Sequence, residues 1–216
     1  DEKEQLVTQA REAGMLAERQ RLARELHDAV SQQLFALAMT AAAARRQLHS
    51  SPDQVEVSLQ RLEDTAKQAQ REMRALLLQL RPVELEEEPL ASAIESLVSE
   101  IEARGLLTCR TELEQNLELS PSTAANLLRI FQEAVTNTLR HARAENLEVR
   151  LYQEADVIRL VIVDDGVGFD LKEALNRRVS LGLTAMQERA QECGGQMKIV
   201  SVPGWGTRIS VQVPRL

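Results

Sequence analysis

A histidine, an acid and an amide lie close together near the start of the chain. Leu26 and Val30 mark the apolar stripe of a helix, and His27 lies about 100° round from Leu26, facing away from that stripe. Asp28 and Gln32 are four residues apart and share a face beside it. A carboxylate that accepts the Nδ1 proton would fix the histidine tautomer and leave Nε2 free to act as a nucleophile. The amide could hold a water molecule for the reverse reaction, a hydrolysis. On helix geometry alone, a solvated face with chance neighbours is the favoured alternative.

A second set of polar residues lies in a predicted helix further along the chain. Glu133 and Asn137 are four residues apart, and Arg140 or His141 continues the same face. Carboxylate and amide oxygens are hard ligands that suit Mg²⁺ bridging to phosphates, and the basic residues could reach phosphate oxygens. A polar helix face explains this segment equally well when it is taken alone.

The turn Asp164-x-Gly166-x-Gly168 follows an apolar strand. Its glycines would allow a sharp turn and a close approach to a ligand, and Asp164 could accept a hydrogen bond from an exocyclic amine such as that of adenine. A strand-end turn is an equally good interpretation, because the pattern is neither of the common dinucleotide and phosphate-loop motifs.

Two further glycine groups follow. Gly182 and Leu183 precede a helix whose free N–H groups would suit a phosphate, and Gly206-Thr207 comes before the last strand. The polar stretch 171–180 is predicted to be either a mobile lid over a nucleotide or a surface helix.

The first 81 residues must position the histidine, and they read as two long helices. They contain a single glycine and a single proline, whereas seven of the nine glycines lie between positions 166 and 206. Apolar residues from Val55 to Leu80 alternate steps of four and three, which is a heptad seam. The apolar faces are wide, so we predict that two hairpins pair in a homodimeric four-helix bundle. Packing of the hairpin on its own C-terminal domain is the alternative.

The rest of the chain predicts a mixed domain. Ser120 and Pro121 have the types expected at a helix start, and Gly105 lies just past a helix end. Helices grouped on one face of a mixed sheet give an α/β sandwich, so the whole chain is predicted to be α+β. The expected helices are 89–104, 121–142 and 183–193, and the expected strands are 106–113, 147–152, 157–163, 197–202 and 207–213.

Composition excludes several classes of function. The chain has 216 residues, a net charge of −7 and only 2% aromatic residues, which argues against direct binding of nucleic acid. It contains no apolar run of membrane-spanning length and no signal-peptide pattern. Its first residues have mid-helix composition, so we expect a sensory or membrane part to precede them. Cys109 and Cys193 form no metal motif, which fits a cytoplasmic setting.

In their order, these segments resemble bacterial two-component sensor histidine kinases of the NarL/DesK-like subfamily. The dimerisation domain of that subfamily carries the motif E-R-x-R-(I/L)-A-R-E-L-H-D, which residues 18–28 match. Its last two residues also begin the motif HDxxxQ, which residues 27–32 match. The stretch as far as Phe35 is similar to cell-envelope-stress kinases of the LiaS/VraS type. The resemblance covers about residues 18–216.

The resemblance implies a dimeric four-helix bundle followed by a Bergerat-type ATP-binding α/β sandwich. Residues 1–17 would be a signalling helix from a missing membrane sensor, 18–82 the dimerisation and phosphotransfer domain, and 83–216 the catalytic domain. The protein would be the cytoplasmic portion of a bacterial membrane sensor.

The resemblance also implies roles for the residues near the start of the chain. His27 matches the phosphoacceptor, Asp28 the residue that activates it, and Gln32 the residue that positions water for dephosphorylating the partner. The partner would be a response regulator with a helix-turn-helix output domain, phosphorylated on an aspartate.

ATP and Mg²⁺ would be bound by the catalytic domain. Asn137 matches the Mg²⁺ ligand, with Glu133 as a possible second one, and Asp164 matches the residue that reads adenine. Subfamily members usually carry lysine where Arg140 stands, and many have a more glycine-rich lid. The other matched nucleotide-binding residues are Gly166, Gly168, Gly182, Leu183, Gly206, Thr207 and His141.

Two other functions remain open at this level. Bergerat-type sites also serve ATPases and serine kinases, which lack the His-Asp pair on a dimerisation hairpin. A pseudokinase scaffold would bind nucleotide without chemistry, and the presence of His27, Asn137 and Asp164 argues against it.

Overall fold

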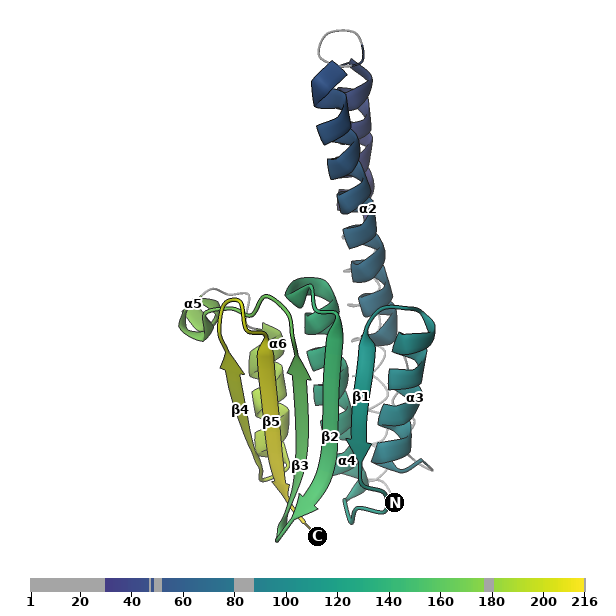
Figure 1. Ribbon diagram of the computed structural model, residues 1–216. Helices are drawn as coiled ribbons and strands as arrows, with labels where there is room; N and C mark the ends of the chain where they lie inside the picture. Colours follow the sequence, from purple (N-terminus) through teal and green to yellow (C-terminus); the bar gives the residue numbers. More distant parts are fainter. Residues whose placement is uncertain (1–29, 47, 49–51, 80–87, 177–180, 216) are drawn as a thin grey trace, which may run out of the picture. The chain divides into compact units, whose positions relative to one another are not determined.

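The computed structural model describes residues 30–46, 48, 52–79, 88–176 and 181–215 (Figure 1). The chain divides into two compact units, residues 1–81 and residues 82–216. In the part of the chain that the structure describes, no helix is both long and apolar enough to cross a membrane.

The first unit is a pair of long helices. Residues 30–46 are helical, and α2 runs from Pro52 to Gln79 beside them. Pro52 is the first residue of α2, where its fixed φ is compatible with a helix start and its missing N–H costs nothing. Ala44 is buried, whereas Leu34 and Phe35 are 61% and 69% exposed. Among the described residues of this unit, several large apolar side chains are therefore left uncovered.

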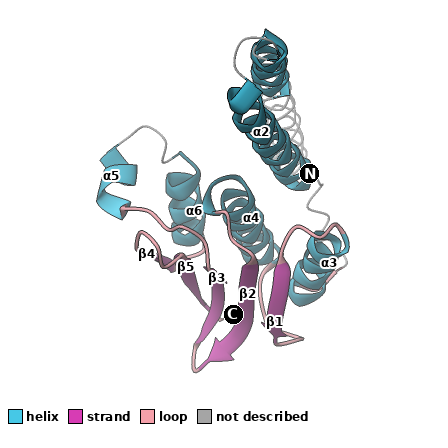
Figure 2. Ribbon diagram, turned by 45° about the horizontal axis from the view of Figure 1, so that its top comes forward, coloured by secondary structure: helices cyan, strands magenta, loops and turns pink. Residues whose placement is uncertain are grey.

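The second unit is a five-stranded mixed sheet in the order β1-β2-β3-β5-β4. Only β1 and β2 are parallel among these neighbours. The helices α3, α4 and α6 cover one face of the sheet (Figure 2), which confirms the predicted α/β sandwich. The strands are β1 (Thr108–Leu113), β2 (Asn146–Glu154), β3 (Val157–Asp164), β4 (Gln196–Ser201) and β5 (Thr207–Pro214), and the helices are α3 (Leu90–Ala103), α4 (Pro121–Asn137), α5 (Leu171–Asn176) and α6 (Leu181–Glu192).

Alternation along β2 explains why only one face of the sheet is covered. Leu147, Val149 and Leu151 are fully buried, because every second side chain of a strand points to the same side. Glu148 and Arg150 lie between them and form an ion pair of 3.1 Å. The apolar side packs against helices, and the charged side faces solvent.

The helix predicted over 121–142 is present over that range, but its last turn is π-helical. The Ser120 side chain accepts the N–H of Thr123 at 3.1 Å, and Pro121 is the first helical residue. The α-helical part, α4, ends at Asn137, and the helix continues to Ala142 as a π-helical turn, η1 (Thr138–Ala142). Arg143, with φ of 52°, then ends the turn in the left-handed region. Turns of this kind occur often at functional sites.

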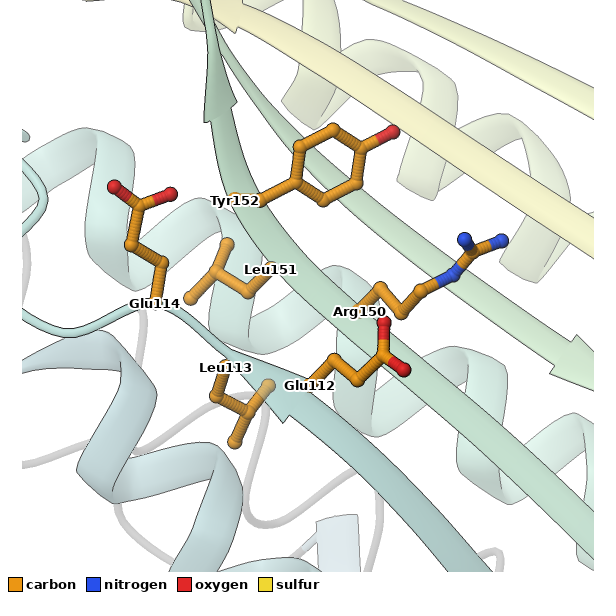
Figure 3. Close-up of a pocket in the computed structure, with 6 residues that line it drawn as sticks. All are labelled: Glu112, Leu113, Glu114, Arg150, Leu151 and Tyr152. Carbon is orange, nitrogen blue, oxygen red and sulfur yellow. The ribbon is translucent and has the colours of Figure 1, made fainter.

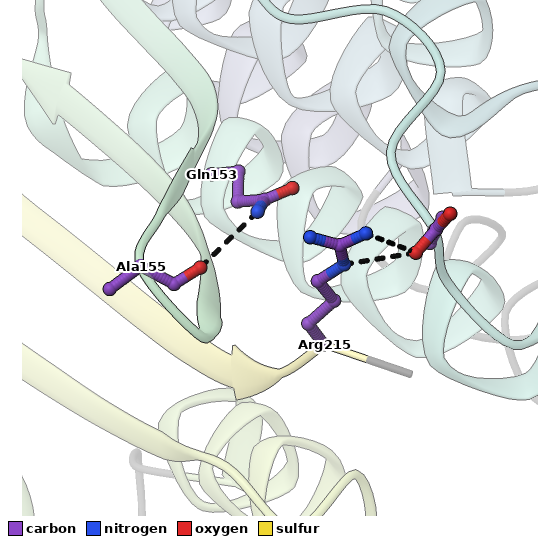
Figure 4. A network of polar contacts seen from close by, with 4 residues as sticks. Gln153, Ala155 and Arg215 are labelled. Atoms are coloured by element: carbon purple, nitrogen blue, oxygen red, sulfur yellow. Dashed lines mark hydrogen bonds and ion pairs between the residues drawn. The ribbon is translucent and has the colours of Figure 1, made fainter.

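Polar contacts lie at the end of the sheet that contains the β2–β3 turn and the end of β5 (Figure 4). Gln153 Nε2 donates to the Ala155 carbonyl oxygen at 3.2 Å across the β2–β3 turn. The Arg215 guanidinium donates two hydrogen bonds, of 2.9 and 2.5 Å, to one carboxylate oxygen of Glu118. The end of β5 is thereby tied to the loop that leads into α4.

Candidate nucleotide site

The predicted carboxylate–amide pair lies together on α4. Asn137 Nδ2 donates to Glu133 Oε1 at 3.4 Å, because a separation of four residues brings side chains onto one helix face. The amide oxygen of Asn137 takes no part in this contact. The pair therefore offers one amide oxygen and one carboxylate as hard ligands.

The start of α6 packs directly on this pair. A Cβ atom on Gly182 would lie 2.1 Å from Glu133 Oε1, so only glycine leaves the carboxylate where it is. Leu183 is half-buried next to it. The N-terminal end of α6 thus lies beside the Glu133 carboxylate. The first N–H groups of a helix have no partner within the helix, and this end carries the positive end of the helix dipole.

Asp164 ends β3 with its side chain buried, 7% exposed. Its Oδ1 accepts the N–H of Gly166 at 2.9 Å, and its Oδ2 contacts Thr138 Oγ1 at 3.4 Å. Burial raises the pKa of Asp164, while hydrogen bonds from Gly166, Thr138 and the Thr207 backbone counteract part of that rise. A buried acceptor at the end of a strand is suited to read an amine of a base.

Thr138 links the two parts of the site, although it belongs to none of the motifs recognised in the sequence. It follows Asn137 directly, and its hydroxyl lies 3.0 Å from the Ala134 carbonyl oxygen and 3.4 Å from Asp164 Oδ2. Asn137, the candidate cation ligand, is therefore linked to Asp164, the candidate base-reading carboxylate, through the next residue in the chain and its hydrogen bond. Only its place beside Asn137 could have drawn attention to it in the sequence.

The glycines near Asp164 allow segments of the protein to touch. A Cβ on Gly166 would lie 2.3 Å from the carbonyl oxygen of Ala142, and one on Gly206 would lie 2.0 Å from the carbonyl oxygen of Asp164. Gly206 also has φ of 80°, which favours glycine. We expected these glycines to make room for a ligand; the atoms nearest to their absent side chains belong to the protein's own backbone.

Ser201 is a second polar residue that the sequence analysis missed. Its hydroxyl accepts the N–H of Phe169 at 2.9 Å, and it contacts the Gly206 carbonyl oxygen and Thr207 Oγ1 at 3.2 and 2.9 Å. Gly168, beside Phe169, packs against the Val202 carbonyl. Ser201 therefore connects the turn after β3 to the β4–β5 hairpin.

Arg140 and His141 both lie in η1, and His141 is exposed. Their predicted alignment with Glu133 assumed 3.6 residues per turn, whereas a π-helical turn contains more residues. That alignment remains a prediction.

The other predicted residues lie in the first unit or in the stretch after Phe169. His27 and Asp28 fall outside the described residues, and Gln32 is helical and exposed. Within the stretch 171–180, residues 171–176 form α5, and 177–180 fall outside the described residues.

The donor set fits a magnesium ion that is shared with a phosphate. No group of three or more His, Cys, Asp or Glu side chains with the geometry of a metal site occurs among the described residues. Mg²⁺ retains several waters and is usually held by one or two protein ligands together with substrate phosphates. Glu133 and Asn137 meet that requirement.

Two cavities in the second unit are separate from these residues. One, of about 460 Å³, lies between the distal parts of β1 and β2, with Glu112, Arg150 and Tyr152 on its walls (Figure 3). The other, of about 300 Å³, lies between the starts of α3 and α4. Asp164 pairs with Leu147 at the opposite end of β2. Neither cavity therefore belongs to the candidate nucleotide site.

Comparison with protein families gives two matches. Residues 18–85 match a family described as histidine kinase, and residues 123–216 match the histidine kinase-, DNA gyrase B- and HSP90-like ATPases. The second match contains α4, η1, β3, α6 and β5, the elements that form the site.

The chain is similar along almost its whole length to curated sensor proteins. It is 38% identical over 214 residues to the sensor histidine kinase LiaS of Bacillus subtilis, which is 99% of this chain and 59% of that protein. It is 42% identical over 197 residues to the sensor protein VraS of Staphylococcus epidermidis, which is 91% of this chain and 55% of that protein. The chain spans somewhat more than half the length of these relatives.

Solved structures share the fold at low sequence identity. The histidine kinase domain of the Erythrobacter litoralis EL346 blue-light activated histidine kinase aligns with a TM-score of 0.52 and 18% identity, covering 84% of this chain and 96% of that domain. The Acinetobacter baumannii histidine kinase AdeS aligns with a TM-score of 0.50 and 15% identity, covering 83% of this chain and 97% of that chain.

Proposed function

The chain belongs to the histidine kinase family, and from this premise we propose that it phosphorylates its own His27 with ATP. The phosphoryl group would then pass to an aspartate of a response regulator. ATP-binding, transferase and two-component signalling roles are properties of the family that the two matched regions define.

One geometric observation supports the nucleotide role most directly. Glu133, Asn137, Thr138 and Asp164 form a continuous series of contacts, and Gly182 brings the start of α6 against its first member. A buried acceptor for a base, oxygen ligands for a cation and a helix N-terminus for phosphates are thereby placed within one small region.

We assign each residue one task in the reaction. Asp164 accepts a hydrogen bond from the adenine amine, while Thr207, which pairs with it across β3 and β5, borders the base. Glu133 and Asn137 would hold Mg²⁺, and the N–H groups at Gly182 and Leu183 would bind phosphate oxygens. When bound, Mg²⁺ neutralises charge on the phosphates, so that positioning and electrostatics provide most of the catalysis.

The histidine supplies the nucleophile. Nε2 of a neutral His27 attacks the γ-phosphorus; an N–P bond forms, the bond to the β–γ bridging oxygen breaks, and ADP leaves. Asp28 accepts a hydrogen bond from Nδ1–H, which fixes the tautomer, and takes that proton as the N–P bond forms. Gln32, which is exposed on its helix, holds the water that hydrolyses the phosphorylated regulator.

The apolar surface of the first unit supports a homodimer. Leu34, Phe35 and Met39 are 61%, 69% and 52% exposed in the single chain. Pairing of two hairpins into a four-helix bundle would cover such side chains, since exposed apolar area of this extent is unfavourable in water.

The remaining assignments come from the family resemblance. We propose residues 1–17 as a signalling helix, 18–82 as the dimerisation and phosphotransfer domain, and 83–216 as the catalytic domain. The partner is a response regulator with a helix-turn-helix output domain, the chain itself does not bind nucleic acid, and it forms the cytoplasmic portion of a membrane sensor.

The test is the replacement His27→Ala. We expect incorporation of label from γ-labelled ATP to fall to background while ATP binding, measured by calorimetry, persists. The wild-type label should be labile in acid and stable in base, as phosphohistidine is and phosphoserine is not. His49→Ala is the matched control and should label normally. Undiminished labelling of His27→Ala would show that the phosphoacceptor is a different residue.

A further inference from the structure

Asp165, the residue between the candidate adenine-reading Asp164 and Gly166, binds the start of β2. Its Oδ1 accepts the backbone N–H groups of Glu145 and Asn146, each at 2.9 Å, and its Oδ2 accepts Asn146 Nδ2 at 2.6 Å. Its own N–H lies 3.4 Å from the Asn146 carbonyl oxygen. One side chain thus satisfies three donors on two successive residues.

The carboxylate is well suited to this task. Burial disfavours its charge, but the hydrogen bonds from Asn146 and Glu145 outweigh that effect and lower the pKa of Asp165. It is therefore ionised at neutral pH, and hydrogen bonds to an ionised acceptor are the stronger kind. Its negative charge also contributes to the raised pKa of the neighbouring Asp164, after the larger effect of burial.

Asp165 binds the segment that leads from the π-helical turn η1 into β2. Residues 142–146 connect η1 to β2, and Arg143 in this connection has φ of 52°, which is strained for a residue other than glycine. The Val167 N–H donates to the Ala142 carbonyl oxygen at 2.7 Å. Segments 142–146 and 164–167 are therefore joined at two points directly after Asp164, at Asp165 and at Val167.

The same connection determines where the two halves of the site lie. Thr138, the first residue of η1, contacts Asp164, and Asn137 precedes it. The contacts of Asp165 and Val167 fix the end of η1 against the turn that carries Asp164. The spacing between Asp164 and Asn137 depends on both ends of η1 being held.

We propose that Asp165 is a positioning residue for nucleotide recognition, which fixes Asp164 relative to the Asn137–Glu133 pair so that base and phosphates bind together. This inference rests on the proposed nucleotide-binding function. Asp165 is itself exposed, and pairing of β2 with both neighbouring strands continues along the sheet without it. Its removal should therefore affect recognition more than folding.

The experiment measures binding of ATP and of inosine triphosphate, which has an oxygen in place of the adenine amine, to the whole chain with Mg²⁺. For Asp165→Ala we expect ATP binding about tenfold weaker, the equivalent of one to two hydrogen bonds, with a much smaller change for inosine triphosphate. The ratio of the two affinities therefore falls. Asp156→Ala removes an exposed carboxylate at the other end of β3 and should leave the ratio unchanged.

A reciprocal exchange separates positioning from general loosening. Asp165→Asn combined with Asn146→Asp reverses donor and acceptor across the 2.6 Å contact and keeps an oxygen for the two backbone N–H groups. It should restore most of the selectivity for ATP, whereas Asn146→Asp alone brings two carboxylates together and should lower it.

Equal weakening of both nucleotides in Asp165→Ala, or an unchanged ratio, would overturn the inference. If Asp165→Ala does not fold, failure of the reciprocal exchange to improve on Asn146→Asp has the same meaning. A wild-type protein that does not distinguish the two nucleotides would instead contradict the proposed role of Asp164.

Discussion

Opposing influences act on the carboxylate of Asp164. Burial raises its pKa, whereas donors from Gly166, Thr138 and Thr207 favour the ionised form. In the proposed complex the adenine amine would donate a further hydrogen bond to this carboxylate and would favour its ionised form. We infer that the residue reduces the stability of the unliganded domain in order to read a base.

Asp164→Asn tests this trade between stability and binding. An amide carries no charge to bury, and its oxygen and nitrogen can still meet the Gly166 N–H and the Thr138 hydroxyl. At pH 7.5 we expect a higher melting temperature than wild type, together with ATP binding weakened by at least about tenfold.

The stability difference should depend on pH in one direction. Because the folded pKa of Asp164 is raised, its unfavourable contribution is absent below the unfolded pKa and develops as pH rises through the folded value. Wild type and variant should therefore converge in acid thermal melts. A variant that is less stable than wild type at pH 7.5 would contradict this account.

Gln32→Ala separates two activities of the same surface. Gln32 is exposed, so its loss should not disturb packing. We expect autophosphorylation to stay within about twofold of wild type, while hydrolysis of the phosphorylated regulator falls at least tenfold. Gln60→Ala, an exposed glutamine on α2, is the control. Normal regulator hydrolysis in Gln32→Ala would remove its proposed role.

At the level of elements, the site depends on helix ends. The α-helix α4 presents Glu133 and Asn137, the π-helical turn then redirects the chain at Thr138, and α6 begins against Glu133. Each of these junctions brings backbone polar groups to a place where a ligand can use them.

Gly182→Ala tests the junction between α4 and α6. The new Cβ would lie 2.1 Å from Glu133 Oε1, the far end of a flexible side chain, which can move aside. We therefore expect a melting temperature within about 2 °C of wild type, but a phosphorylation rate at least tenfold lower because Glu133 is displaced. Thr184→Ala, at an exposed position of the same helix, should do neither. A normal phosphorylation rate in Gly182→Ala would mean that the position of Glu133 is unimportant.

At the level of the whole molecule, the chain consists of two compact units with different apolar surfaces. The sheet unit buries Phe131, Ile94 and Leu160 inside itself, although Trp205, in the turn between β4 and β5, is 85% exposed. The helical unit leaves Leu34 and Phe35 mostly exposed. The sheet unit therefore has a core of its own, whereas the proposed dimer would cover Leu34 and Phe35 of the helical unit.

Phe35→Glu tests dimerisation through the helical unit. An apolar side chain of this size contributes about 2 kcal/mol when buried, and a two-fold dimer contains it twice, so the dimer dissociation constant should rise at least tenfold. Sedimentation equilibrium of the whole chain measures it. Gln70→Glu adds the same charge at an exposed polar position of α2 and should leave the dimer intact. An unchanged constant for Phe35→Glu would place the interface elsewhere.

The sequence by itself determined the classes and order of the elements. Alternation along 147–152 and 157–163 predicted β2 and β3, and Ser120-Pro121 predicted the start of α4, because strand burial and helix capping depend on nearby residues. The same local spacing predicted the contact between Glu133 and Asn137. Motif order gave the family, which the comparisons confirm.

Only the tertiary structure decided which residues support the site. Several contacts join segments that lie far apart in the chain: that of Thr138 with Asp164, that of Ser201 with Phe169, and that of Asp165 with Asn146. The π-helical turn places Thr138 for the first of them. The close approach of Gly182 to Glu133 depends in the same way on how α6 packs on α4. Such contacts depend on where distant backbones meet, and helical or strand periodicity contains no information about that distance.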